Sequence, residues 1–145
     1  MTDPIEPLLQ ECGFKYTKEF DPSGASTYCL PFDSPQGTIL VRLLVNSAVF
    51  SAYTFLRALD SIAVPSSKKS LFLDLLKLNA ENRLARVGLW SFQDDETEWI
   101  MVVADTLPEN LNANLVRALI QETVSLAELV LQAIAKHALP QKQLK

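Results

Sequence analysis

The 145-residue chain has few of the residues that carry chemistry: one histidine, two cysteines and four glycines. A single histidine cannot form a two-histidine metal site, and the glycines fit neither of the common phosphate-binding loops. The net charge of −4 argues against binding to nucleic acid or to an anionic membrane, since such proteins carry a basic patch. These absences favour a binding or structural role over catalysis, and we expect no cofactor and no metal.

The pattern of residues predicts neither a signal peptide nor a membrane span. The segment Met1-Thr2-Asp3-Pro4 does not begin a basic stretch followed by an apolar one, and no window of about 18 residues is apolar without charge. Cys12 and Cys29 do not form a CxxC pair. We therefore expect a cytoplasmic protein with two reduced, mostly buried thiols, a disulfide or redox role being the alternative.

What the chain does have is apolar content of 48% with 21% charged residues, typical of a globular domain that can bury a core without staples. We expect one domain over residues 1–138 and a flexible tail over 139–145.

Hydrophobic periodicity predicts the elements of that domain. Helices are predicted from Asp3 and Pro4 to Gly13, from Ser66 or Ser67 to Glu81, and over 112–138. Strands are predicted over 26–32, 38–45, 48–59, 83–92 and 98–105. A helix is the alternative for 48–59, and 14–20 is a strand or an extended lead-in. The prediction is an α+β domain in the order α-β-β-β-α-β-β-α, with a mainly antiparallel five-stranded sheet packed by helices.

Apolar residues are concentrated in two of these elements. The helix that ends at Glu81 is apolar around most of its circumference, and the strand from Trp99 to Ala104 is apolar at every position. Both should be covered from two sides, which predicts a homodimer, or a groove for an extended segment of a partner protein. The candidate interface residues are Leu71, Phe72, Leu75, Leu76, Trp99 and Met101.

Three further features have structural explanations that we prefer to catalytic ones. His137 lies at a helix C-terminus, where a cationic ring suits the helix dipole. The four carboxylates between 94 and 98 are best explained as a solvated hairpin tip, with a cation site or catalysis as alternatives. Trp90 and Trp99 should lie on adjacent strands but point to opposite faces, because a five-residue loop would pair 91 with 99.

Two segments carry a family resemblance. The stretch Leu75-Leu76-Lys77-Leu78-Asn79-Ala80-Glu81-Asn82 resembles the junction from helix to strand in YbjN-type proteins of the type III secretion chaperone superfamily. The stretch Leu107-Pro108-Glu109-Asn110 before a long helix is similar as well. The resemblance covers residues 65–138, and over 1–60 it extends only to the order of elements.

The resemblance implies a small acidic homodimer that binds an extended partner segment through apolar patches, without cofactor. YbjN-like proteins mostly lack an assigned activity. We expect Asn79, at the family's junction position, to bond backbone groups at the helix end. The predicted function is non-enzymatic, chaperone-like or adaptor-like protein binding. The alternative is a carrier of a small apolar ligand in a pocket lined by residues such as Phe50, Tyr53 and Trp90.

Overall fold

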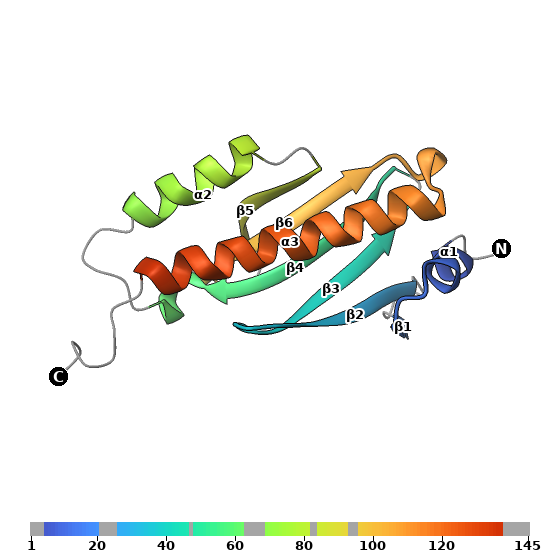
Figure 1. Ribbon diagram of the computed structural model, residues 1–145, viewed down its shortest axis with the longest axis horizontal. Coiled ribbons are helices and arrows are strands. Elements are labelled where there is room, and N and C mark those ends of the chain that lie inside the picture. Colours follow the sequence, from blue (N-terminus) through green and yellow to red (C-terminus); the bar gives the residue numbers. More distant parts are fainter. Residues whose placement is uncertain are drawn as a thin grey trace.

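Six antiparallel strands form one sheet in the computed structural model, which describes residues 5–20, 26–46, 48–62, 69–81, 84–92 and 96–137. The strand order is β1-β2-β3-β4-β6-β5 (Figure 1). The α+β class and the antiparallel sheet are as predicted. The elements are α1 (Ile5–Cys12), β1 (Thr17–Phe20), β2 (Ser26–Ser34), β3 (Gly37–Val45), β4 (Phe50–Ala58), α2 (Lys69–Glu81), β5 (Ala85–Ser91), β6 (Glu98–Thr106) and α3 (Ala113–His137), with short 3₁₀ helices at Leu59–Ser61 and Pro108–Asn110.

The prediction of five strands is wrong by one. The segment after Gly13 does form a strand, β1, because it pairs with β2 from Thr17↔Cys29 to Phe20↔Ser26. The strand prediction for 48–59 is confirmed, and its helix alternative is excluded. Asn46 supports the turn before β4, since its side-chain oxygen accepts from the amides of Ala48 and Val49. The residues predicted to cap the first two helices, Asp3, Ser66 and Ser67, lie outside the described residues, as do 138–145.

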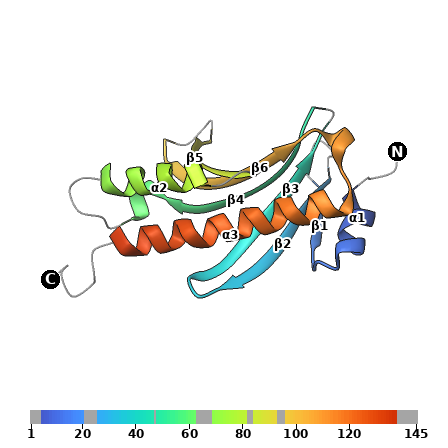
Figure 2. The same cartoon turned by 45° about the horizontal axis from the view of Figure 1, so that its top comes forward.

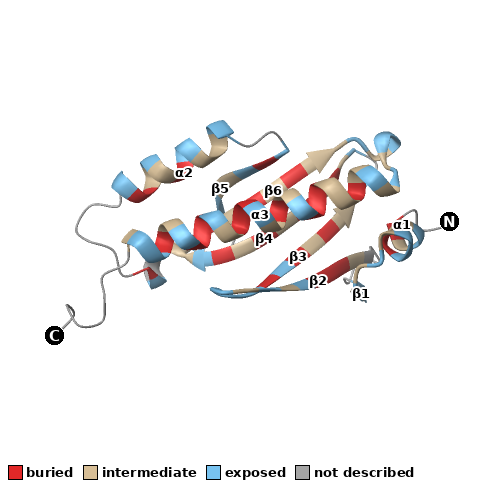
Figure 3. Ribbon diagram, viewed as in Figure 1, coloured by how far each residue is buried: buried red, intermediate tan, exposed pale blue. Residues whose placement is uncertain are grey.

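The three α-helices that the structure describes lie on one side of the sheet (Figures 1 and 2). The long helix α3 crosses it, α2 lies beside α3 near β5, and α1 packs at the other end of α3. Asn112 caps α3 by accepting from the amide of Leu115 at 2.9 Å. By length and composition α3 is apolar enough to cross a membrane, which the sequence pattern did not predict. Its buried stripe, visible in Figure 3, packs on the sheet, and core helices meet the same test.

The core follows the alternation of side chains along each strand. Alternate positions of β3, β4 and β6 point toward α3 and are buried, while their neighbours point to the opposite side, which we call the outer face. No helix or strand among the described residues covers the outer face. The core residues facing α3 on these strands are Ile39, Val41, Leu43, Phe50, Ala52, Thr54, Leu56, Ile100, Val102 and Ala104.

Candidate functional site

The outer face of the sheet has an apolar centre. On β6, Ile100, Val102 and Ala104 are buried in the core, whereas Trp99 and Met101 point to the outer face and are half-buried there. Met101 lies opposite Phe55 of β4 on one side and Gly88 of β5 on the other. The sequence predicted that both faces of this strand are covered; the helices and strands that the structure describes cover only one.

An aromatic cluster centred on Phe55 occupies this part of the face. The Phe55 ring lies 5.7 Å from Tyr53, 5.2 Å from Phe92 and 6.4 Å from Trp99, measured between ring centroids. These spacings fall in the range in which aromatic pairs stabilise one another. A shallow depression of about 380 Å³ runs along the cluster. It is lined by Leu44, Ser51, Tyr53, Phe55, Trp90, Phe92, Met101, Val103 and Asp105.

The two tryptophans are direct cross-strand partners, contrary to the prediction. Trp90 pairs with Trp99, and Ser91 with Glu98. The connection from 92 to 97 is one residue longer than predicted, and a one-residue change of register moves a side chain to the other face. Both indoles therefore belong to the outer face.

Two ion pairs flank the aromatic cluster. Arg42 contacts Glu19 at 3.0 Å on the β3 side, and Arg86 contacts Asp105 at 2.8 Å on the β5 side. Burial raises the pKa of the Tyr53 hydroxyl; the Arg42 charge opposes this shift, and Glu19 and Cys29 add to it. The Tyr53 hydroxyl is therefore protonated and uncharged at neutral pH. The Arg42–Glu19 and Arg86–Asp105 pairs add no net charge beside the cluster.

The predicted interface residues fall into two groups. Leu71 and Leu75 of α2 are buried within the chain itself, so they are not available to a partner. Phe72 is half-buried against the core, and Leu76 is 62% exposed beside β5. Trp99 and Met101 lie together on the outer face. Among the described residues α2 is covered on one side only, because Leu73 and Leu76 face outward, and its cover by a second chain stays a prediction.

Asn79 connects α2 to the edge strand β5. Its amide nitrogen donates to the Val87 carbonyl at 3.0 Å, and its oxygen accepts from the Val87 amide at 2.6 Å. The sequence predicted that Asn79 bonds backbone groups at the helix end. In the structure, the backbone groups that it bonds belong to the neighbouring strand β5. The side chain thus satisfies both outward-facing backbone groups of Val87, as a further strand would.

Replacing Asn79 by Ala should lower the free energy of unfolding by about 1–2 kcal/mol, since two hydrogen bonds to one residue are lost. Urea denaturation measures the change. Asn114→Ala, at an exposed position of α3, is the control and should change stability by less than about 0.5 kcal/mol. Equal effects of the two substitutions would show that Asn79 is not a tie between α2 and β5.

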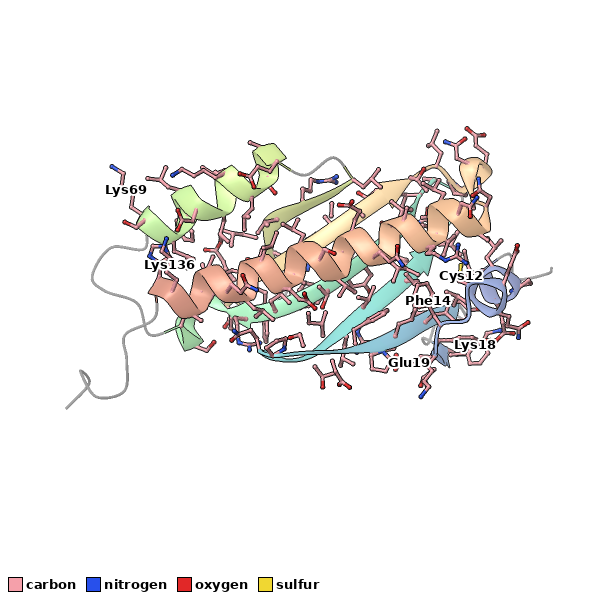
Figure 4. All side chains as sticks on the ribbon, viewed as in Figure 1. Cys12, Phe14, Lys18, Glu19, Lys69 and Lys136 are labelled. Carbon is pink, nitrogen blue, oxygen red and sulfur yellow. The ribbon has the colours of Figure 1, made fainter. Side chains whose placement is uncertain are left out.

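His137 at the end of α3 is bonded to Asp74 of α2, with 2.6 Å between Nε2 and Oδ2. Lys136 also lies 3.8 Å from Asp74, and Figure 4 shows it at the same end of the molecule as Lys69. The sequence did not reveal this carboxylate partner, because 63 residues separate the pair. A hollow of about 310 Å³ beside them, between α2 and α3, is lined by Asp74, Lys77, Leu78, Leu129, Gln132, Ala133 and Lys136. That lining contains no serine, threonine or cysteine to act as a nucleophile, so a structural tie between two helices fits the pair best.

The hydrogen bond from His137 lowers the pKa of Asp74 and outweighs the opposing effect of desolvation, and the positive charge of Lys136 adds a smaller lowering. Because the folded-state pKa lies below the unfolded one, this contribution to stability is present above the ordinary carboxyl value and is lost as the pH falls through the acid range. Asp74→Asn should therefore be less stable than wild type at about pH 7, with the gap narrowing toward about pH 3. Urea denaturation at both pH values measures the gap. The exposed control Glu109→Gln should show no such narrowing; a gap for Asp74→Asn that is independent of pH would contradict the assignment.

The remaining chemical candidates stay apart. Asp94 and Asp95 of the acidic cluster lie outside the described residues. Within the described residues, no three His, Cys, Asp or Glu side chains gather as a metal site would require. Cys12 and Cys29 are both free thiols.

No protein-family model matches the chain, and no curated protein matches it. Among solved structures, the fold is similar to the crystal structure of YbjN from E. coli, described as a candidate transcription regulator. The similarity has a TM-score of 0.59 at 17% sequence identity and covers 94% of this chain and 93% of that one. It supports a YbjN-like fold, as the sequence resemblance implied, while the relation to secretion chaperones stays a prediction. A shared fold does not fix a function.

Proposed function

We propose that the protein is a non-enzymatic, protein-binding subunit, adaptor-like or chaperone-like, that forms a homodimer through the outer face of its sheet. One observation carries the proposal: an apolar, aromatic surface lies at the centre of a sheet face that no described helix or strand covers. Monomeric proteins rarely expose contiguous apolar patches of this kind, and such patches commonly mark protein–protein interfaces.

The composition of the face suits a second copy. Sheets stack face to face about 10 Å apart with their strands roughly aligned, which would place one Phe55 cluster on the other. A homodimer interface needs an apolar centre with a polar rim. Here the Arg42–Glu19 and Arg86–Asp105 pairs form that rim on two sides. The charges of these pairs cancel, so two chains of net charge −4 could meet at this face without local repulsion.

The contacts of the titratable residues support the non-enzymatic part of the proposal. The histidine is engaged with Asp74, and the hollow beside it is lined by no serine, threonine or cysteine. The alternative function, a carrier of a small apolar ligand, needs the pocket that was predicted around Phe50, Tyr53 and Trp90. Phe50 is buried on the core side, however, while Tyr53 and Trp90 lie on the outer face. These three residues do not line a common cavity between the sheet and the helices.

Sedimentation equilibrium tests the homodimer over a range of protein concentrations. We expect a mass of twice 16.1 kDa at tens of micromolar, falling toward 16.1 kDa on dilution. A single mass of 16.1 kDa throughout would count against the homodimer.

A further inference from the structure

The strands β3 and β4 are hydrogen-bonded over only half of their length. Their register runs from Arg42↔Tyr53 to Val45↔Phe50. Beyond it, residues 37–41 pair only with β2, and residues of 54–58 pair only with β6. The β2–β3 hairpin consequently diverges from β4 in Figures 1 and 2. We call the space between these two facing strand edges the seam.

The seam contains a hollow of about 260 Å³. It is lined by residues 36–40, 54–57 and Leu131 of α3. Leu131 is 5% exposed and forms its floor on the helix side. Arg57 carries the one charge among the lining residues; it is exposed, and its Nη1 donates to the Leu56 carbonyl at 2.7 Å. The seam is therefore a slot with an apolar floor and strand backbone on both walls, and its one charge is the guanidinium of Arg57.

The backbone groups on the two walls point into the slot. Asn79 bonds both backbone groups of Val87, which fixes them as pointing away from β6. In an antiparallel sheet, the backbone groups of successive residues point to alternate sides of their strand. When this alternation is followed from Val87 of β5 through the registers of β6 and β4 to β3, the N–H and C=O groups of Thr38 and Leu40 point toward β4. By the same alternation those of Phe55 point toward β3. The sheet thus presents two unpaired strand edges that face one another.

We propose that the seam binds an extended, uncharged segment of another protein, which inserts as a strand between β3 and β4. Two facing strand edges favour an extended backbone, since only a strand can form hydrogen bonds with both walls. The insertion of a strand into a sheet that opens to admit it is an established mode of peptide recognition. A second copy is not the occupant, because each strand that the structure describes already uses at least one edge in its own sheet and so cannot bond both walls. This inference rests on the protein-binding function proposed above and names the kind of partner.

The geometry sets requirements for the inserted segment. Because β3 and β4 are antiparallel, the segment runs antiparallel to one and parallel to the other. Alternate side chains point to Leu131 and to the outer face. A β-branched apolar residue suits the Leu131 side, and a small polar residue suits the side near Leu40, which is 45% exposed.

A capped heptapeptide of alternating threonine and valine is a suitable probe, followed by amide chemical shifts and hydrogen exchange of the full chain. We expect shift changes and slower exchange at Thr38, Leu40 and Phe55. Two further peptides carry backbone N-methyl groups at the odd or at the even positions. Insertion uses both edges of the peptide, so each N-methylated form should bind at least about tenfold more weakly. Addition to an outer sheet edge would be weakened by only one of the two forms.

Leu40→Pro and Leu40→Ala provide the matched variants. Proline removes the N–H that points into the seam, at a position where β2 does not need it, so folding should be retained. We expect Leu40→Pro to weaken peptide binding at least about tenfold and Leu40→Ala to weaken it only slightly. Should Leu40→Pro not fold, the pair of N-methylated peptides decides alone.

Three results would overturn the inference: no shifts at the seam with millimolar peptide, sensitivity to only one N-methylated form, or seam amides that are protected without peptide and lose protection on dilution. The last result would identify a second copy as the occupant. The outcome is separable from the homodimer, because a chain that sediments as a monomer and still binds the peptide at the seam would refute the dimer alone.

Discussion

Met101→Arg should convert the protein from a dimer into a monomer at concentrations at which the wild type is dimeric. Met101 lies at the centre of the outer face, with Phe55 and Gly88 as its neighbours on the adjacent strands. In the proposed dimer an arginine there would bury an unpaired charge against the second copy. Substitution of central interface residues costs about 2–4 kcal/mol, which corresponds to about a 30- to 700-fold weaker dimer. Sedimentation equilibrium measures the change.

The control is Leu73→Arg on α2. Leu73 is 49% exposed and lies away from the outer face, so the dimer should be unaffected. Thermal unfolding should show both variants folded, since Met101 packs on the outer face rather than in the core. Dissociation by Leu73→Arg and not by Met101→Arg would place the interface on the helical side, contrary to the proposal.

Phe50→Ala should lower the free energy of unfolding by about 3–5 kcal/mol, since it removes a buried aromatic ring and leaves a cavity. Phe50 is 0% exposed and sits on the core side of β4. The sequence left open that this residue lines a ligand pocket, in which case truncation would change ligand binding more than stability. Urea denaturation of the variant distinguishes the two roles.

Phe20→Ala is the matched control for that measurement. Phe20 is 69% exposed at the end of β1, so the same truncation should cost less than about 0.5 kcal/mol. A cost below about 1 kcal/mol for Phe50→Ala would show that the site is not close-packed.

The elements that the sequence predicted well are those whose signals are local. The strand at 38–45 alternates in burial, and the long helix has both a continuous apolar stripe and the Asn112 cap. Proline is confined to strand edges and ends, and the strand predicted over 26–32 contains one, Pro31. It lies in β2 beyond the end of β1, where its missing N–H costs no bond between these two strands. The strand β1 was left ambiguous because its four residues are mostly exposed and show no clear alternation.

The predictions that failed depend on contacts distant in sequence. The register of β5 on β6 depends on loop length to within one residue, and an error of one residue put Trp90 on the wrong face. The Asp74–His137 pair joins two helices whose relative placement no local pattern encodes. The seam arises where two predicted strands diverge, which neither strand's own sequence records.

The excess of apolar residues was the main evidence in the sequence for a binding surface. The structure changes which part of the molecule carries that surface. Leu71 and Leu75 of α2 are used within the chain, so the helix explains less of the excess than predicted. On β6 the excess of apolar surface remains, because no described helix or strand covers Trp99 and Met101 on the outer face. The candidate site is therefore a sheet face rather than a helix.

The two tryptophans of the chain provide the most direct test, since Trp90 and Trp99 both lie on the outer face. Acrylamide quenching of their fluorescence should be measured over a dilution series from tens of micromolar to nanomolar. If two outer faces stack, quenching is weak at high concentration and rises cooperatively on dilution as the indoles are uncovered. Quenching that stays the same at every concentration would contradict a dimer formed through this face.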